Sequence, residues 1–389
     1  MGIKICFVTT SSVSIESFIL PCVGELERKK FEVSFVTSCK KGFIEKCPAS
    51  VKIYDFSVDR GFDFFGTFLA ARKFKKLCLQ EKFDMVVYAT PNGALYGSLG
   101  AKAAKVPCRI LAQWGMRYVG FDGFKRFIIK NIEKISCRRS TDIRNVSHKN
   151  RELAINDGMY KPDKCKVLGA GGTIGVDLDV YKLEDVPLNR DKIRNAYNIP
   201  GDAVVYSFVG RLCRDKGVGE LLSAFDSLSE NCTNAYLMLI GGIDDNSMLE
   251  KSVLDRAKEN PRVVFCGAVP NESVAMYLAA ADVLVHPTYR EGFGMVLQEA
   301  AALALPTITT DIPGASEAIV DNVTGILAQK GDVLSLRDAM LKLLDLELRV
   351  RLGKAGRQRV EKAFERSMMI ERMVDDYLEI YHSRINDVK

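Results

Sequence analysis

Short runs of β-branched and other apolar residues alternate with helical stretches along almost the whole chain. Its first half contains six candidate strands and five stretches with helical periodicity. Such alternation predicts parallel sheets whose faces are covered by helices. The expected strands are 3–9, 32–37, 51–55, 85–89, 109–112 and 142–146, and the expected helices are 14–30, 64–80, 93–105, 124–138 and 148–157.

The alternation is interrupted over residues 169–200, where glycine, aspartate and proline accumulate as in a hinge. A chain of 389 residues is long enough for two domains. We therefore expect an α/β protein with two Rossmann-like domains facing across a cleft, 1–180 and 181–366, and a C-terminal helix over 367–389 that packs back on the first. The second series comprises expected strands 204–209, 235–240, 263–266, 283–285 and 307–309, and expected terminal helices 346–364 and 368–382.

The composition indicates a folded cytoplasmic protein with an uneven charge distribution. No stretch approaches the roughly 18 apolar residues of a spanning helix, and the first ten residues read as a core strand, not a secretory leader. The eleven cysteines have no paired spacing, which favours buried thiols over disulfides or zinc. Residues 1–175 contain 30 Lys and Arg against 16 Asp and Glu, whereas residues 176–389 contain 25 against 33. The basic half is expected to face something anionic, with a solvated charged surface as the alternative.

The most informative motif covers residues 286–299, His-Pro-Thr-Tyr-Arg-Glu-Gly-Phe-Gly-Met-Val-Leu-Gln-Glu, between an expected strand and a helix. Gly292 and Gly294 allow the backbone to approach a ligand, and the N-terminus of the following helix favours a diphosphate. Two carboxylates, Glu291 and Glu299, bracket this anion site. Because a carboxylate repels phosphate, both are better explained as acceptors for sugar and ribose hydroxyls. An ordinary loop with a solvated glutamate is the alternative.

A second motif, Val-Gly-Arg-Leu-Cys-Arg-Asp-Lys-Gly over residues 209–217, follows the first strand of the second domain. Arg211 and Lys216 place two cations at the carboxyl end of that strand, unless they are merely solvated loop charges. Fixed cations there can stabilise a leaving nucleoside diphosphate without a metal. No His, Asp and Cys cluster has metal-ligand spacing, so neither a metal nor another cofactor is expected. The first strand is not followed by G-x-G-x-x-G, which argues against a dehydrogenase.

Together these motifs resemble the GT-B retaining glycosyltransferases of family four, also called glycosyltransferase group 1, of the bacterial surface-polysaccharide and lipid-linked oligosaccharide type. The resemblance covers most of the chain and is densest over residues 200–330. The resemblance implies that one glutamate contacts the donor sugar and the other the ribose. It also implies that an arginine and a lysine bind the diphosphate. By this resemblance the catalytic residues are Glu291, Arg211 and Lys216, and the donor-binding residues are Glu299, Phe293, Gly294, Met295, Gly210, Gly241, Gly267 and Val269.

The first domain of that family supplies the acceptor side. Residues 113–120, Gln-Trp-Gly-Met-Arg-Tyr-Val-Gly, resemble the family's Gly-Leu-Arg-Tyr segment, with Trp114 where many relatives have His or Arg. Residues 121–139 combine apolar side chains with a basic fringe, which suits an anionic membrane surface or a lipid diphosphate. A helix packing on its sheet is the alternative. The residues expected on the acceptor or membrane side are Trp114, Arg117, Tyr118, Lys125 and Arg126.

These features predict a cytoplasmic enzyme, peripheral on the inner face of the plasma membrane. We expect it to move GalNAc, GlcNAc, Gal or Glc from a UDP-sugar to a lipid-linked or oligosaccharide acceptor, with retention, in surface glycan biosynthesis. The alternatives are a soluble sugar acceptor, a GDP-sugar donor, or a non-catalytic nucleotide-sugar binding protein. Nucleic acid is not expected, because aromatic and basic residues do not interleave on a strand platform. His148 and His286 are expected to be structural.

Overall fold

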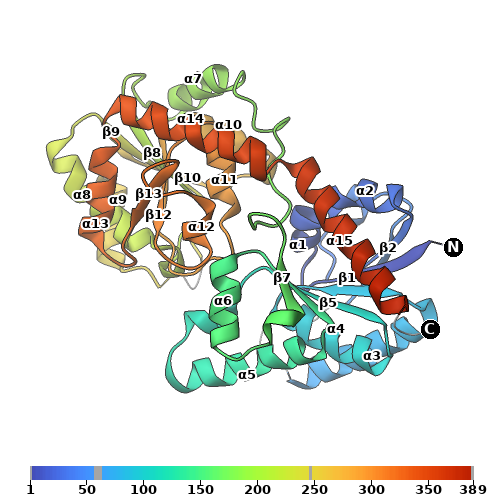
Figure 1. The fold of residues 1–389 in the computed structure, drawn as a ribbon. Helices are drawn as coiled ribbons and strands as arrows, with labels where there is room; N and C mark the ends of the chain where they lie inside the picture. The colour runs from blue at the N-terminus through green and yellow to red at the C-terminus, as the bar shows by residue number, and fades with distance from the viewer. Residues whose placement is uncertain (1, 57–63, 245–247, 387–389) are drawn as a thin grey trace. The chain divides into compact units, whose positions relative to one another are not determined.

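The computed structural model describes residues 2–56, 64–244 and 248–386, and the chain divides into two compact units. Unit 1 comprises Met1–Ile174 and Ser367–Lys389, and unit 2 comprises Gly175–Arg366. Each unit is built on one parallel sheet covered by helices (Figure 1). The predicted fold class, two Rossmann-like α/β domains, is confirmed.

The sheet of unit 1 has seven parallel strands in the order β3-β2-β1-β4-β5-β6-β7. In its centre, Ile5 of β1 is in register with Val33 of β2 on one side and with Met85 of β4 on the other. The chain order reverses between β1 and β4, so the loops that follow these two strands open at the point where ligands bind in such sheets. The strands are β1 (Ile3–Val8), β2 (Phe31–Thr37), β3 (Lys52–Asp55), β4 (Met85–Tyr88), β5 (Cys108–Gln113), β6 (Asp142–Asn145) and β7 (Cys165–Val167).

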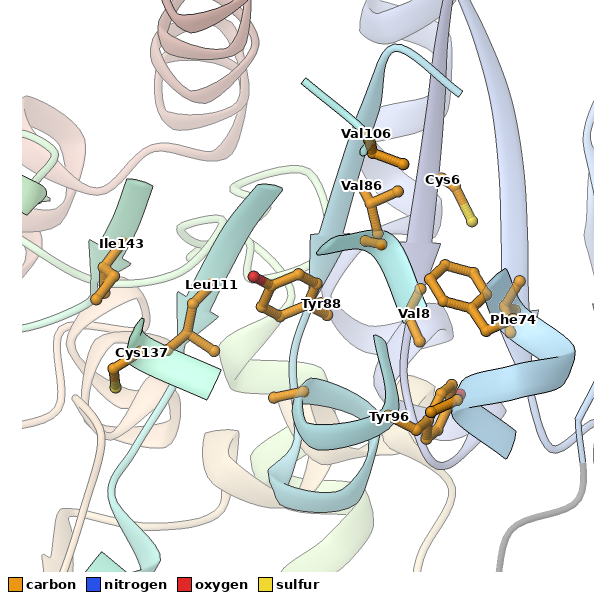
Figure 2. Packing of buried hydrophobic residues seen from close by; sticks show 14 of the residues in the cluster. Cys6, Val8, Phe74, Val86, Tyr88, Tyr96, Val106, Leu111, Cys137 and Ile143 are labelled. Carbon is orange, nitrogen blue, oxygen red and sulfur yellow. The ribbon is translucent and has the colours of Figure 1, made fainter. Parts of the chain in front are cut away.

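Helices cover both faces of this sheet and create two buried clusters. On one face, Phe74 of α3 and Tyr96 of α4 pack with Val8 of β1 (Figure 2). On the other face, Phe7 of β1 packs against Tyr377 of α15, with ring centroids 6.2 Å apart. The helices are α1 (Ser12–Phe18), α2 (Val23–Arg28), α3 (Phe64–Glu81), α4 (Pro91–Ala103), α5 (Gly123–Arg139), α6 (His148–Asn156) and α15 (Arg366–Asn386).

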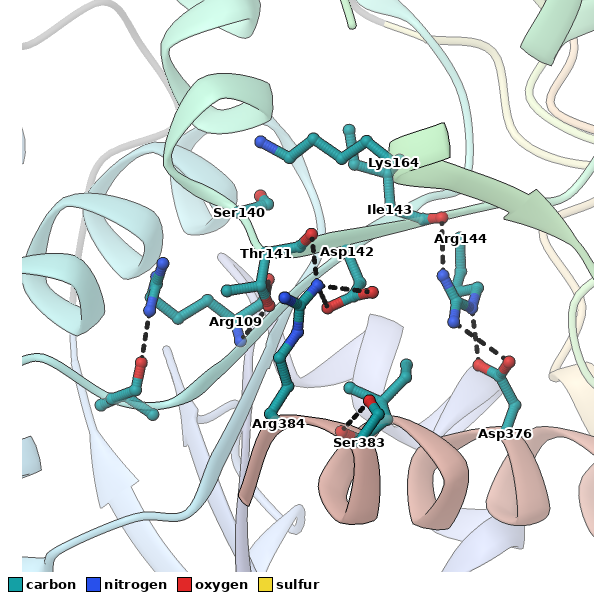
Figure 3. Close-up of polar contacts among 12 residues, drawn as sticks. Arg109, Ser140, Thr141, Asp142, Ile143, Arg144, Lys164, Asp376, Ser383 and Arg384 are labelled. Carbon is teal, nitrogen blue, oxygen red and sulfur yellow. Dashed lines mark hydrogen bonds and ion pairs between the residues drawn. The ribbon is translucent and has the colours of Figure 1, made fainter. Parts of the chain in front are cut away.

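The C-terminal helix α15 is also tied to unit 1 by ion pairs (Figure 3). Arg144 of β6 donates from Nε to Asp376 at 2.6 Å and from Nη2 at 3.1 Å. Arg384 lies 3.2 Å from the carboxylate of Asp142. The Asp376 side chain is almost fully buried, so removing Arg144 would leave a buried charge with less compensation. Helix α15 is therefore part of the core of unit 1.

The sheet of unit 2 has six parallel strands in the order β10-β9-β8-β11-β12-β13. The chain runs outward from β8 to β10 and then returns to place β11 on the other side of β8. The loops after β8 and β11 consequently meet at the switch point of this sheet. The strands are β8 (Val204–Val209), β9 (Ala235–Ile240), β10 (Val263–Gly267), β11 (Val283–His286), β12 (Thr307–Thr310) and β13 (Gly325–Ala328).

On one face of the unit 2 sheet, α8 and α13 form a buried cluster with the strands. Phe225 of α8 and Met340 of α13 are fully buried there, beside Phe208 of β8. The helices of unit 2 are α7 (Val186–Ala196), α8 (Val218–Asn231), α9 (Lys251–Glu259), α10 (Val274–Ala279), α11 (Met295–Ala302), α12 (Ala315–Ala318), α13 (Val333–Lys342) and α14 (Leu346–Ala363).

Three expectations about local structure need correction. The helix expected over residues 14–30 is split into α1 and α2 by a 3₁₀ turn at Leu20–Cys22, because Pro21 cannot continue an α-helix. The expected hinge, residues 169–200, contains helix α7, whose Pro187 lies in the first turn where proline is tolerated. Strands β7 and β13 lie outside the expected ranges, because β7 has three residues with a lysine in the middle and β13 begins with a glycine, so neither reads as a typical strand.

Candidate active site

The loops that follow β8 and β11 pack tightly against each other at the switch point of unit 2. Asp215 accepts a backbone hydrogen bond from Tyr289 at 3.0 Å through its carbonyl, and its carboxylate lies 2.8 Å from the Arg290 guanidinium. Gly217 has φ 68°, and a Cβ there would lie 1.9 Å from the carbonyl oxygen of Pro287. Only glycine fits at this contact, which fixes the position of Lys216 directly before it.

Two side chains, one from the loop after β8 and one from the end of β11, converge on one carboxylate oxygen of Glu291. Lys216 Nζ lies 2.6 Å from Oε2 of Glu291, and His286 Nε2 lies 3.2 Å from the same oxygen. Burial alone would raise the pKa of Glu291, but the charge of Lys216 and the hydrogen bond from His286 outweigh it and hold that pKa well below its usual range. Glu291 is therefore a fixed anion, and two of the three predicted catalytic residues lie together.

The second predicted carboxylate, Glu299, lies on α11 in a different environment. Burial raises the pKa of Glu299 to about 7, against the opposing effects of a hydrogen bond with Tyr181 and of the Arg366 charge. Tyr181 belongs to the segment that precedes α7. Arg357 holds this segment in place by donating a hydrogen bond to the Tyr181 carbonyl at 3.1 Å. The pKa of Glu299 is thus raised and that of Glu291 lowered, a difference that the spacing of the two residues does not predict.

The glycine-rich loop between these carboxylates leads directly into α11. Gly294 has φ 88° and is the N-cap of α11, with no side-chain cap hydrogen bond. Phe293 is buried and packs on Phe364, with ring centroids 5.5 Å apart, so it anchors the loop. Met295 is the first residue of α11. Phe293 therefore contributes through its backbone and through packing, while the helix N-terminus adds positive potential beside Glu291.

The third predicted catalytic residue, Arg211, lies apart from this group. Its side chain is 66% exposed and forms an ion pair with Asp244, in the loop after β9. Lys216 is instead paired with Glu291. That Arg211 and Lys216 bind the same diphosphate therefore stays a prediction. It requires that the ion pair between Arg211 and Asp244 breaks.

The predicted glycines lie at the ends of three neighbouring strands: Gly210 and Gly241 directly follow β8 and β9, and Gly267 is the last residue of β10. Gly241 has φ 149°, and a Cβ there would lie 1.8 Å from the carbonyl oxygen of Gly210. The Gly241 N–H donates to Gly267 at 2.8 Å. Gly267 has φ 71° and open space around it, and Val269 nearby is half-buried. Gly210 and Gly241 are thus explained by loop packing, whereas Gly267 borders open space.

The predicted acceptor segment of unit 1 is partly structural. Gln113 is buried and accepts a hydrogen bond from Tyr160 at 2.7 Å. Trp114 is half-buried and packs on Phe18, with ring centroids 4.8 Å apart. Tyr118 is fully buried. Its ring fills the core beneath α5, so the expected place of Tyr118 on the acceptor or membrane side stays a prediction.

The basic residues of this segment border the surface. The backbone N–H of Arg117 donates to Glu133 at 2.9 Å. Lys125 is exposed and lies 4.4 Å from the centroid of the Phe121 ring. Arg126 is bound to Asp157 at 3.0 Å and covers Tyr118. Lys125 and Arg126 lie in the first turn of α5.

Two threonines at the switch point of unit 1 were not recognised individually in the sequence. The hydroxyls of Thr10 and Thr90 are 2.7 Å apart, in the loops after β1 and β4. Thr90 has φ 63°, a conformation that a β-branched residue rarely adopts. Gly93 packs against this pair, since a Cβ there would lie 2.8 Å from the Thr90 hydroxyl oxygen. Strain of this kind is concentrated at functional sites.

Two negative findings apply to residues 2–56, 64–244 and 248–386. No three His, Cys, Asp or Glu side chains come together there as a group that could hold a metal ion. No helix there is long and apolar enough to cross a bilayer.

Comparison with known proteins identifies the class. Residues 189–359 match the family described as Glycosyl transferases group 1, and residues 4–147 match the family described as Glycosyl transferase 4-like. The chain belongs to the group 1 glycosyltransferases and is a glycosyltransferase. The resemblance drawn from the motifs is therefore confirmed.

Individual relatives extend over nearly the full chain. The capsular polysaccharide biosynthesis glycosyltransferase CapM of Staphylococcus aureus is 31% identical over 360 residues, which cover 90% of this chain and 91% of CapM. The N,N'-diacetylbacillosaminyl-diphospho-undecaprenol alpha-1,3-N-acetylgalactosaminyltransferase of Campylobacter jejuni is 26% identical, with 99% of this chain and 100% of that protein covered. Anabaena HepE, solved with UDP and glucose, superposes with a TM-score of 0.75 at 18% identity, over 97% of this chain and 99% of HepE.

Proposed function

We propose that this glycosyltransferase takes a sugar from a UDP-sugar and transfers it, with retention of configuration, to a hydroxyl of a lipid-linked saccharide. The observation that carries the proposal is the contact of Lys216 with Glu291 at the β8/β11 switch point, beside the N-terminus of α11. A cation, a helix N-terminus and a fixed carboxylate match a donor that has a diphosphate and a sugar. The complex of Anabaena HepE with UDP and glucose supports UDP as the nucleotide.

In the proposed reaction, the acceptor oxygen forms a bond to the anomeric carbon as the bond from that carbon to the diphosphate oxygen breaks. The acceptor proton passes to an oxygen of the leaving phosphate. Lys216, Arg211 and the N-terminus of α11 supply positive charge where negative charge develops, so we propose that neither metal nor cofactor is needed. Glu291 accepts a hydroxyl of the donor sugar, and Glu299 accepts from the ribose. Phe293, Gly294 and Met295 offer backbone N–H groups to the diphosphate.

The proposed acceptor is lipid-linked, as the name of the Campylobacter relative states for that protein. The exposed tip of α5 supports a membrane role, because Phe124 and Phe127 are 76% and 62% exposed and Ile128 is 40% exposed. Lys125 adjoins them. Apolar residues beside basic ones bind anionic bilayer surfaces, and the proposed location is the cytoplasmic face of the plasma membrane.

A second exposed group on α3 belongs to the same sheet face. Phe65 and Phe68 are 73% and 56% exposed, and Leu69 is 49% exposed. Helix α3 packs on α4, and α4 packs on α5. Both exposed groups begin their helices, which start at the same edge of the parallel sheet. They could therefore contact one bilayer together.

A donor panel tests the proposed function. Purified protein is heated with UDP, GDP, UDP-GlcNAc, UDP-GalNAc, UDP-Gal, UDP-Glc and GDP-mannose, and slow donor hydrolysis is measured in parallel. We expect UDP and one UDP-sugar to raise the unfolding temperature, because a ligand that binds only the folded state stabilises it. Stabilisation by GDP compounds alone would contradict the UDP proposal. Hydrolysis of a donor with inversion at the anomeric carbon would contradict the retaining mechanism.

A further inference from the structure

His286 is the last residue of β11, and its side chain is enclosed by the protein. It is 2% exposed and stacks on Phe208, with ring centroids 5.9 Å apart and an interplanar angle of 15°. Its Nε2 lies 3.2 Å from Oε2 of Glu291. Packing on Phe208 fixes the plane of the ring, and that plane points Nε2 at the carboxylate.

The protonation of His286 follows from its two ring nitrogens. An ionised carboxylate only accepts, so Nε2 must carry the hydrogen in the contact with Glu291. Nδ1 is buried and has no hydrogen-bond partner in the described part of the chain. Burial lowers the pKa of His286 in spite of the nearby Glu291. The imidazole is therefore a neutral donor with one hydrogen, already directed at Glu291.

Lys216 and His286 donate to the same oxygen but differ in what else they can do. Lys216 has three N–H donors on a flexible stem, so it can turn to phosphate oxygens when a diphosphate arrives. His286 has one donor on a ring held by Phe208. Once Lys216 is shared with the diphosphate, the His286 ring still donates to Oε2 of Glu291, while the Gly292 N–H donates to Oε1 at 3.2 Å.

We infer that His286 is a positioning residue that keeps the Glu291 carboxylate directed at the donor sugar while Lys216 engages the diphosphate. The role of Glu291 toward the sugar rests on the proposed function. The contact of His286 with Glu291 is an observation that does not depend on the proposed function. Two experiments therefore separate a failure of the inference from a failure of the proposed function.

The first experiment needs no substrate. The chain has three histidines, so the side-chain nitrogen signal of His286 can be assigned in ¹⁵N-labelled protein by single substitution. We expect the neutral Nε2–H form from about pH 6 to 8, with a proton that exchanges slowly with water. In Glu291→Ala that proton should exchange quickly. An imidazolium, the Nδ1–H form, or an Nε2 proton unaffected by Glu291→Ala would overturn the inference.

The second experiment compares two substitutions of the same residue. His286→Gln keeps a side-chain N–H near the position of Nε2, whereas His286→Leu keeps only bulk. For the UDP-sugar that the wild type hydrolyses, we expect His286→Leu to lower kcat/KM about 10- to 100-fold and His286→Gln to stay within about 5-fold. UDP binding should be nearly unchanged in both variants, because UDP lacks the transferred sugar that Glu291 would hold. Equal losses of kcat/KM in the two variants, or a matching loss of UDP binding, would indicate that His286 acts only through packing and would overturn the inference.

A double-mutant cycle distinguishes action through Glu291 from any separate effect. In a Glu291→Gln background, His286→Leu should cost less than about 3-fold, because there is no carboxylate left to position. Multiplicative losses in the double variant would overturn the inference. Circular dichroism of all variants, at a temperature well below unfolding, verifies that each is folded.

Discussion

Lys216 and Glu291 are separated by 75 residues in the sequence, yet Nζ of one lies 2.6 Å from Oε2 of the other. The contact exists because β8 and β11 are neighbours in a parallel sheet, and each residue lies in the loop that leaves its strand. The pair joins a group suited to phosphate with a group suited to a sugar hydroxyl. Its energetic and catalytic importance can be measured with single substitutions.

Replacing Lys216 should abolish most activity without unfolding the protein. Lys216→Met keeps the stem and removes the charge, and we expect kcat to fall by about 10²- to 10³-fold. The matched control is Arg214→Ala, because Arg214 is an exposed cation in the same 3₁₀ turn. It should keep kcat within about 3-fold. Similar losses in the two variants would mean that general positive potential matters more than the Lys216 contact.

Gly217 and Gly219 form a second matched pair, two residues apart. Gly217→Ala would place a Cβ 1.9 Å from the Pro287 carbonyl at φ 68°, so we expect a loss of about 2–4 kcal/mol in the free energy of unfolding. Gly219→Ala meets nothing within 4 Å and lies in α8, so it should gain up to about 1 kcal/mol. Urea titration measures both. Equal effects would show that the two loops are not locked together at Gly217.

Glu299 should make stability depend on pH. Its pKa is raised from 4.5 to about 7, so the folded state holds this proton more tightly than the unfolded chain. The resulting stabilisation is complete below about pH 4.5 and is lost as pH rises through about 7, by about 1–3 kcal/mol. Glu299→Gln should remove this component, so the gap between variant and wild type changes over that range. A constant gap in urea midpoints from pH 4.5 to 8 would contradict the raised pKa.

The exposed tip of α5 should be needed for membrane binding. Phe124→Ser with Phe127→Ser should weaken binding to vesicles of phosphatidylglycerol and phosphatidylcholine by about 10- to 100-fold, because two aromatic side chains no longer enter the bilayer. Stability should change little, since both side chains are exposed. Leu188→Ser on α7, at a side chain 74% exposed, is the matched control and should bind as the wild type. Unchanged flotation of the double variant would exclude this surface.

Much of the fold could be predicted because its strands are short apolar runs with clear ends. Strands β8 and β9 coincide with the expected ranges 204–209 and 235–240. The meeting of Lys216 and Glu291 also follows from a general rule, that parallel strands open their carboxyl ends at one edge. The predicted glycosyltransferase family followed from residues placed at those ends.

Other features of the site could not be predicted from the order of residues in the sequence. The pairing of Arg211 with Asp244 joins two charged loop residues that could each have been solvated. The positive φ of Thr90 is imposed by the packing of neighbouring loops, against the preference of the residue itself. The sequence favours a structural role for His286, and its contact with Glu291 is visible only in three dimensions. Tertiary context decides each of these cases.

The return of α15 to unit 1 has a consequence for how the protein is made. Unit 2 is one continuous segment, Gly175–Arg366, whereas the core of unit 1 includes Tyr377, which the ribosome adds after all of unit 2. Unit 2 can thus complete its folding during synthesis, while the half that emerges first must wait with an uncovered sheet face. The usual order of vectorial folding, N-terminal domain first, is reversed here.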